Sequence, residues 1–417
     1  MERYTGYKIV FVGLLLLLFY ACSPTKYIGE NEYLLNKVTV KTADKAVSRS
    51  DLKKNIRQKP NTRILGVLRF HLGMYNLSGR NGEKRFNKWL RTIGEAPVVY
   101  NDFHTQRSLA QLNLYLNNKG YYHALVSDTV IYKNKKANVE YRISPGKQTV
   151  IEEFGYRDKQ NYVQNQLEDS TELMQIVLAD SVHSLLKAGK PLDMDLMESE
   201  RERVTRMLRE KGYFNFSKNF IQFYADTIQG QEVDKAHLLL SVIGNSADSS
   251  AYRKFRIGEI NINFDYDPLY LVSGADSSYV DTTYGGYGII YRDKLKIKPK
   301  LIEETIQFKE GELYNVQKVV DSYSRLQALN LFKFINIVFK EKADTTGVKS
   351  LVCDVQLIPM KRQSYNVFLE GTHNSGNIGV GGNLTYNHRN LFQGGENLTF
   401  SIWGALKKEQ LNENKIF

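Results

Sequence analysis

The chain has 417 residues, of which 42% are hydrophobic, and a formal net charge of +12. This length predicts more than one domain, and the apolar content is sufficient to build globular cores. The positive charge suits nucleic acid or an anionic membrane surface. The N-terminus carries an export signal, which argues against nucleic acid as a partner.

The export signal begins with the cations Arg3 and Lys8, which precede an apolar run over residues 9–19. A membrane-spanning helix needs about 20 apolar residues, so this shorter run predicts a signal peptide instead. The run ends in Ala21-Cys22, and a Cys after a small residue resembles a bacterial lipobox. We predict a lipoprotein signal peptide over 1–21, acylation of Cys22 and a tether over 22–32. The alternative is a plain secretory signal with an incidental Cys.

The second of the two cysteines, Cys353, lies in an alternating apolar run with Leu351, Val355 and Leu357. Alternation of this kind is typical of a strand with one buried face. We therefore expect Cys353 to pack in a core. With Cys22 lipidated, no disulfide framework is available.

Three segments repeat one pattern, in which an amphipathic helix ends at Gly or Asn and an aromatic residue then leads into a strand. Gly and Asn tolerate the left-handed backbone conformation that ends many helices. We predict that these turns form structural joints at Gly120 and Tyr121, at Gly212 and Tyr213, and at Asn330 and Phe332.

Strand-like runs surround each of the three turns. One strand precedes each repeated helix, at 34–41, 150–156 and 255–264. Two more follow each turn, at 124–132 with 137–143, at 219–224 with 237–243, and at 334–340 with 350–358. Each unit therefore reads β-α-α-β-β, which predicts an α+β fold.

This order of elements resembles the POTRA domain, the periplasmic module of the Omp85 superfamily. The resemblance predicts three tandem POTRA-like units over residues 33–146, 147–245 and 253–360. Residues 268–299 are rich in Tyr, Ser, Asp and Gly. We predict that they form a loop insertion within the third unit.

Beyond Arg362 the sequence alternates strictly between apolar and small or polar residues. Tyr365, Val367 and Leu369 open this pattern, and two further runs continue it at 378–387 and 397–406. Strands of this kind are typical of a transmembrane β-barrel. We predict the start of an Omp85-type barrel over 361–417. A sheet of three strands has edge backbone groups that find no hydrogen-bond partner in lipid. We therefore expect the barrel to be incomplete.

The sequence carries no recognised enzyme motif: H-E-x-x-H, G-x-S-x-G, the P-loop and C-x-x-C are all missing. We therefore expect no catalytic, metal-binding or cofactor-binding residues. The charged segment 198–203 predicts a solvated helix face with local ion pairs.

The lipobox, three POTRA-like units and a barrel start together resemble the BamA/TamA family. They are most similar to its lipoprotein form in Bacteroidetes, the translocation and assembly module lipoproteins (TamL). The segments 59–66 and 70–77 carry this finer resemblance. It implies an outer-membrane location with the POTRA arm in the periplasm. The implied partners are a TamB-like inner-membrane-anchored protein, unfolded outer-membrane proteins and outer-membrane lipid.

Two other functions stay open. One is a dedicated secretion pore of the same superfamily, and the other is a structural or adhesin lipoprotein without an assembly role. The tether adds a geometric expectation, because its dozen residues reach only roughly 40 Å when extended. Three domains in line would span about 90 Å. With both ends held at one membrane, the arm should bend or lie along it.

Overall fold

The computed structural model describes residues 24–42, 44, 46–64, 66, 68–79, 84–158, 161–163, 172–228, 235–242, 249–267, 279–342, 350–374 and 377–408. The predicted signal peptide and Cys22 lie outside these residues. The described residues form a mixed α+β fold with four separate sheets of three, four, five and three strands.

The first sheet has the strand order β1-β3-β2, with β1 (Leu34–Thr42) parallel to β3 (Lys136–Ser144) and β2 (Leu125–Lys133) antiparallel to it. Helix α5 (Asp102–Asn118) packs on this sheet through the buried side chains of Leu112 and Leu116. Between β1 and α5 lie the short helices α2 (Arg49–Lys54), α3 (Phe70–Leu77) and α4 (Arg85–Ile93).

The second sheet has the order β5-β4-β7-β6, one strand more than the predicted unit. Its strands are β4 (Val150–Asp158), β5 (Asn161–Val163), β6 (Ile221–Ile228) and β7 (Lys235–Val242). Helices α6 (Glu172–Ala179) and α7 (Met194–Glu210) supply Leu173, Val204 and Leu208 to its core.

The segment 198–203 of α7 is not the fully solvated face that its charges predict. The side chain of Glu200 is 0% exposed and pairs with Arg203. Glu200 lies three residues after Met197 and four residues before Val204, and both of these residues face the core. This spacing places Glu200 on the buried side of α7, and the prediction failed because it rested on charge alone.

The third sheet has the order β11-β12-β8-β10-β9. Its strands are β8 (Arg256–Asn263), β9 (Tyr279–Tyr284), β10 (Tyr287–Arg292), β11 (Phe332–Lys342) and β12 (Ser350–Pro359). Helices α9 (Pro299–Thr305) and α10 (Val316–Ala328) cover it, and Leu326 of α10 is fully buried. Tyr323 of the same helix is 42% exposed.

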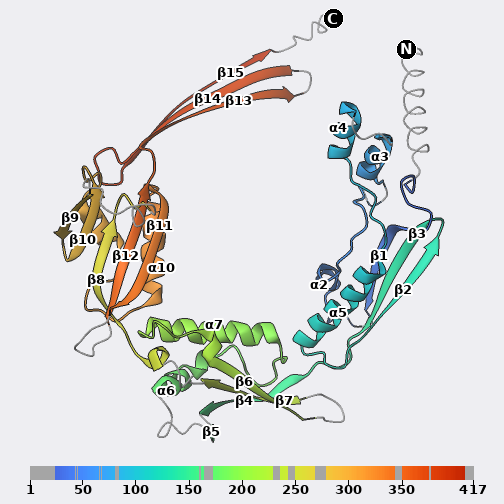
Figure 1. The fold of residues 1–417 in the computed structure, drawn as a ribbon, viewed down its shortest axis with the longest axis horizontal. Helices are drawn as coiled ribbons and strands as arrows, with labels where there is room; N and C mark the ends of the chain where they lie inside the picture. The colour runs from blue at the N-terminus through green and yellow to red at the C-terminus, as the bar shows by residue number, and fades with distance from the viewer. Residues whose placement is uncertain are drawn as a thin grey trace, which may run out of the picture.

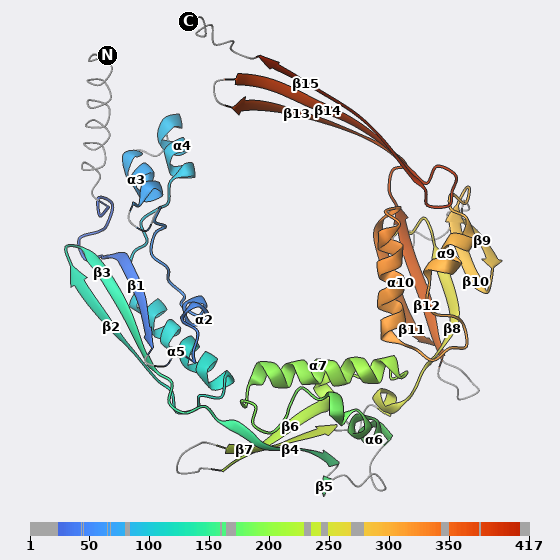
Figure 2. The same cartoon turned by 180° about the vertical axis from the view of Figure 1, so that it is seen from behind.

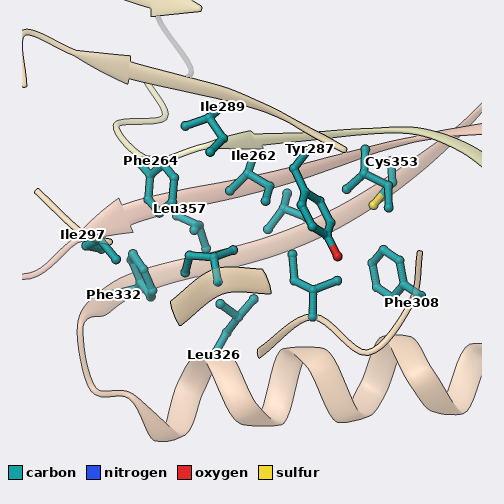
Figure 3. Close-up of a cluster of buried hydrophobic side chains, with 14 of the residues drawn as sticks. Ile262, Phe264, Tyr287, Ile289, Ile297, Phe308, Leu326, Phe332, Cys353 and Leu357 are labelled. Carbon is teal, nitrogen blue, oxygen red and sulfur yellow. The ribbon is translucent and has the colours of Figure 1, made fainter. Parts of the chain in front are cut away.

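The predicted loop insertion over 268–299 is wrong for its described part, which forms the hairpin β9–β10. Gly285 and Gly286 have positive φ values of 61° and 87° and make the two-residue turn. Tyr287 and Ile289 of β10 then enter the same core as Cys353 of β12 (Figure 3). The many turn-forming residues of this segment outweighed the alternation of apolar residues in β10 and led to the prediction of a loop.

The fourth sheet is an open antiparallel meander of β13 (Gln363–Asn374), β14 (Asn377–Arg389) and β15 (Asn397–Lys408). Figure 1 shows the four sheets following one another along an arc. Figure 2 shows the same arc from behind, with α3 and α4 near one end and β13–β15 at the other, both on the same side.

Candidate strand-acceptor edges and joints

The first strand of each α/β sheet has part of its outer edge covered by the segment that leads into the long helix. In the second sheet, Ile151 N–H donates to the Lys190 carbonyl at 2.8 Å, and Gly189 N–H donates to the Ile151 carbonyl at 2.7 Å. Ile257 of the third sheet makes the same two bonds, at 2.8 and 2.7 Å, with residues 311–312. These contacts satisfy backbone groups of β4 and β8 at positions where no strand pairs with that side.

The first sheet covers its corresponding edge in a similar way. Leu35 N–H donates to the Val98 carbonyl at 2.8 Å, and Tyr100 N–H donates to the Tyr33 carbonyl at 2.7 Å. The Arg63 guanidinium adds a bond to the Asn36 carbonyl at 2.8 Å.

The opposite edge of each sheet is open. These edges are formed by β2, β6 and β11, and no strand among the described residues pairs with their outer sides. Side chains along β2 are also accessible, with Leu125 74% and Ile131 57% exposed. An open edge carries unpaired N–H and C=O groups that can bind an added strand with little demand on its sequence.

The long helices α5, α7 and α10 all begin in the same way. Each begins after a side-chain N-cap: Asn101 accepts from Phe103 N–H, Asp193 from Asp195 N–H, and Asn315 from Gln317 N–H. Such caps satisfy the free donors of the first turn. These caps were not among the predicted residues, although Asn or Asp before each amphipathic run is a recognisable signal.

The predicted turn residues end the same helices. Gly120, Gly212 and Asn330 have φ values of 83°, 102° and 54°, in the left-handed region. Tyr121, Tyr213 and Phe332 follow them and are 6%, 0% and 5% exposed. Burial raises the pKa of the Tyr213 hydroxyl above its ordinary value.

Gly120 lies at the contact between the first and second sheets. Its carbonyl accepts from Thr149 N–H at 2.9 Å, and the Thr149 carbonyl accepts from Leu192 N–H at 2.9 Å. Lys119 reaches across the same contact and forms ion pairs of 2.8 Å with both Asp193 and Asp195.

The contact between the second and third sheets repeats this backbone relay. The Gly212 carbonyl accepts from Phe255 N–H at 2.9 Å, and the Phe255 carbonyl accepts from Tyr314 N–H at 2.9 Å. The Arg209 guanidinium donates to the Tyr314 hydroxyl at 3.1 Å. Phe214 packs edge-on against Tyr314, with ring centroids 5.0 Å apart.

The contact between the third and fourth sheets does not repeat this relay. Lys298 N–H, just before α9, donates to the Gln393 carbonyl in the turn between β14 and β15 at 2.9 Å. Asn390, in the turn between β14 and β15, adds a side-chain bond to the Lys296 carbonyl at 2.7 Å. Backbone bonds between non-adjacent segments therefore hold all three contacts.

The fourth sheet gathers apolar side chains on one face. Its register pairs Val367 with Leu384 and Leu384 with Ile402, and directly paired residues share a face. These three side chains are 72%, 46% and 55% exposed. Polar groups hold the other face together, as where Thr385 and Ser401 lie 3.1 Å apart. A wide exposed apolar face of this kind marks a contact with lipid or protein.

Elsewhere, the described residues contain few side-chain groups suited to metal binding or catalysis. None of their His, Cys, Asp and Glu side chains form a group of three or more suited to a metal ion. Cys353 is fully buried, and burial raises the pKa of its thiol. No described helix is long and apolar enough to cross a membrane.

No family model and no curated protein matches the sequence. The structural neighbours include CdiB and POTRA domains of BamA. A fragment of Haemophilus influenzae BamA with POTRA domains 3–5 matches at 14% identity and a TM-score of 0.36, over 79% of this chain and 99% of its own.

Two longer structures match as well. BamA from Haemophilus ducreyi lacking POTRA domains 1–3 has 12% identity and a TM-score of 0.33, over 62% of this chain and 37% of its own. CdiB from Acinetobacter baumannii has 13% identity and a TM-score of 0.28, over 73% of this chain and 46% of its own. The chain thus spans less than half of either structure. TM-scores this low add no support to a function.

Proposed function

We propose that this chain is an outer-membrane assembly or translocation factor of the Omp85 superfamily. In this proposal its three α/β sheets belong to POTRA-like units over 33–146, 147–245 and 253–360. They receive β-strands of partner or client proteins, and the fourth sheet begins the membrane barrel. Cys22 carries the lipid anchor, and the arm lies in the periplasm.

The open outer sides of β2, β6 and β11 carry this proposal, because they recur in all three sheets. Backbone contacts cover part of the first strand of each sheet, β1, β4 or β8, and in the third sheet β9 also has an outer side that no described strand pairs with. A sheet that needed no partner would gain from blocking both edges. An unfolded outer-membrane strand or a TamB-like protein could pair with an open edge through its backbone.

Site-specific photocrosslinking tests the edge binding. A photoreactive residue at Ser127 or Thr129, both exposed on β2, should capture a peptide copying residues 397–408. That peptide supplies the alternating pattern of a barrel strand. Arg142 serves as the control position, because it is exposed but lies on the central strand β3. A scrambled peptide of the same composition should crosslink several-fold less.

Equal capture at Arg142 and at the β2 positions would sink the edge proposal. In cells, depletion of the protein separates the remaining functions. Loss of many outer-membrane proteins supports assembly, and loss of a single exported protein supports a secretion pore. An unchanged outer-membrane protein content favours a structural or adhesin lipoprotein.

The membrane role of the fourth sheet gives a second prediction, which compares two neighbouring residues of β14. Leu384→Arg places a charge on the apolar face and should reduce the carbonate-resistant membrane fraction. The cost of such a charge in a barrel is about 2–4 kcal/mol at the bilayer midplane. Asn383→Arg, on the polar face, should leave that fraction near the parent level. The same loss in both variants contradicts the assignment of the faces.

A further inference from the structure

Helix α4 exposes an apolar stripe that lies outside every hydrophobic core of the described residues. Phe86 is 67%, Trp89 53% and Ile93 40% exposed. These positions recur at helical spacing and share one face. The Phe86 and Trp89 rings stack with centroids 5.8 Å apart. Leu90, which neighbours Phe86 and Ile93 on the helix surface, is only 4% exposed and holds α4 to the protein.

The rest of the α4 surface carries basic side chains. They are Lys84, Arg85, Lys88 and Arg91, and α4 itself contains no acidic residue. Arg91 bonds to the Ser78 hydroxyl at 3.1 Å and the Gly79 carbonyl at 3.2 Å. Among the described residues, no carboxylate forms an ion pair with Lys84, Arg85 or Lys88. Three cations therefore stay available on the same helix segment as the exposed aromatic rings.

Close backbone contacts hold α4 against α3. Glu95 N–H, just after α4, donates to the His71 carbonyl of α3 at 3.0 Å. A Cβ added at Gly94 would lie 2.6 Å from the Tyr75 backbone nitrogen, so the two helices approach where only glycine fits. Leu77 at the end of α3 is also 53% exposed. The helix pair thus presents this surface in a defined orientation.

The helix pair lies on the same side of the arc as the fourth sheet (Figures 1 and 2). A bilayer that holds β13–β15 would extend toward the surface of α3 and α4. We infer that α4 lies in the interface of that same membrane, with Phe86, Trp89 and Ile93 inserted and its cations on lipid phosphates. This inference rests on the proposed membrane role of the fourth sheet.

A lipid surface fits α4 better than a protein groove does. Aromatic rings beside Lys and Arg are typical of helices that lie at the headgroup level. Three unpaired cations suit many phosphates spread over a surface. With this contact the chain touches the membrane at both ends of its arc. The open edges of β2, β6 and β11 would then lie within a limited depth below the membrane.

Tryptophan fluorescence can test the two contacts separately, because the chain has only 2 Trp residues, Trp89 and Trp403. The full chain with Trp403→Phe reports on α4 alone. Trp403 pairs with Asn383 on the polar face, so it suits the sheet poorly as a reporter. A chain with Trp89→Phe, Trp403→Phe and Phe400→Trp reports on the apolar face of β15 instead.

Both reporters are placed in nanodiscs that contain brominated phospholipid. We expect several-fold quenching of Trp89 with phosphatidylglycerol present, and weaker quenching in phosphatidylcholine alone. Quenching at position 400 with none at Trp89 overturns this inference and leaves the proposed function standing. No quenching at either position overturns both.

Paired variants separate charge from insertion in the Trp89 reporter. Lys84→Glu with Lys88→Glu should remove the phosphatidylglycerol dependence, whereas Arg206→Glu with Lys211→Glu at the end of α7 should retain it. Phe86→Ser should weaken quenching in both lipids. Its control is Leu114→Ser, a similar change at a residue of α5 that is 60% exposed. Equal effects of test and control variants contradict a specific contact through α4.

Discussion

Replacing Glu200 with Ala is expected to destabilise the second sheet by about 3–5 kcal/mol, the usual cost of leaving a buried charge without its partner. The Glu200 carboxylate accepts from Arg203 Nε at 2.9 Å and Nη2 at 2.8 Å. It also accepts from Leu185 N–H at 3.0 Å. The substitution leaves this donor unsatisfied and opens a cavity. Because Asp180 also pairs with Arg203, the loss of stability should lie near the lower end of this range.

Glu198→Ala on the same helix is the matched control. The Glu198 side chain is 39% exposed and pairs with Arg201 at 3.2 Å. Exposed pairs of this kind contribute about 0.2–1 kcal/mol. A chain with several sheets need not unfold in one step, so amide hydrogen exchange of β4 and β7 is the measurement. Equal protection in the two variants would falsify the structural role of Glu200.

Gly120→Ala is expected to loosen the contact between the first two sheets. At a φ of 83°, an Ala side chain costs about 1–2 kcal/mol. The new Cβ would also lie 2.8 Å from the Leu192 carbonyl oxygen. This oxygen belongs to the backbone, and Leu192 N–H is bonded to Thr149. Relief therefore requires the two sheets to move apart.

Gly189→Ala separates the two causes, because Gly189 has a φ of 80° and no atom within 4 Å of an added Cβ. Gly189→Ala should therefore show only the free-energy cost of an Ala in the left-handed backbone conformation. Spin labels at Thr129 on β2 and Gln222 on β6 can report the distance between the sheets. We expect Gly120→Ala to broaden that distance distribution and Gly189→Ala to leave it unchanged. Identical distributions would mean that Gly120 does not hold this contact.

Local pattern was sufficient to place the repeated elements. The helix predicted before Gly212 is α7, and the strand predicted at 150–156 is β4 (Val150–Asp158). The strict alternation after Arg362 marks β13 to β15. These features follow from periodicity and from Gly or Asn at helix ends, and both depend on neighbouring residues.

Contacts between distant segments could not be read in this way. The β9–β10 hairpin joins the third sheet because β10 pairs with β8 at residues 288–290. The bond from Leu185 N–H to the Glu200 carboxylate joins residues 15 positions apart, and it leaves no mark on the local pattern of α7. The exposure of Trp89 depends likewise on how α3 and α4 pack.

The sequence by itself determined the repeat, the turn residues and the apolar alternation of the last strands, because each of these depends on the spacing of nearby side chains. Only the tertiary structure decided which strand edges are covered. The coverage depends on backbone bonds such as that between Ile151 and Lys190, across residues of no special type. Backbone groups are the same at every position, so no side-chain pattern can reveal which of them find partners.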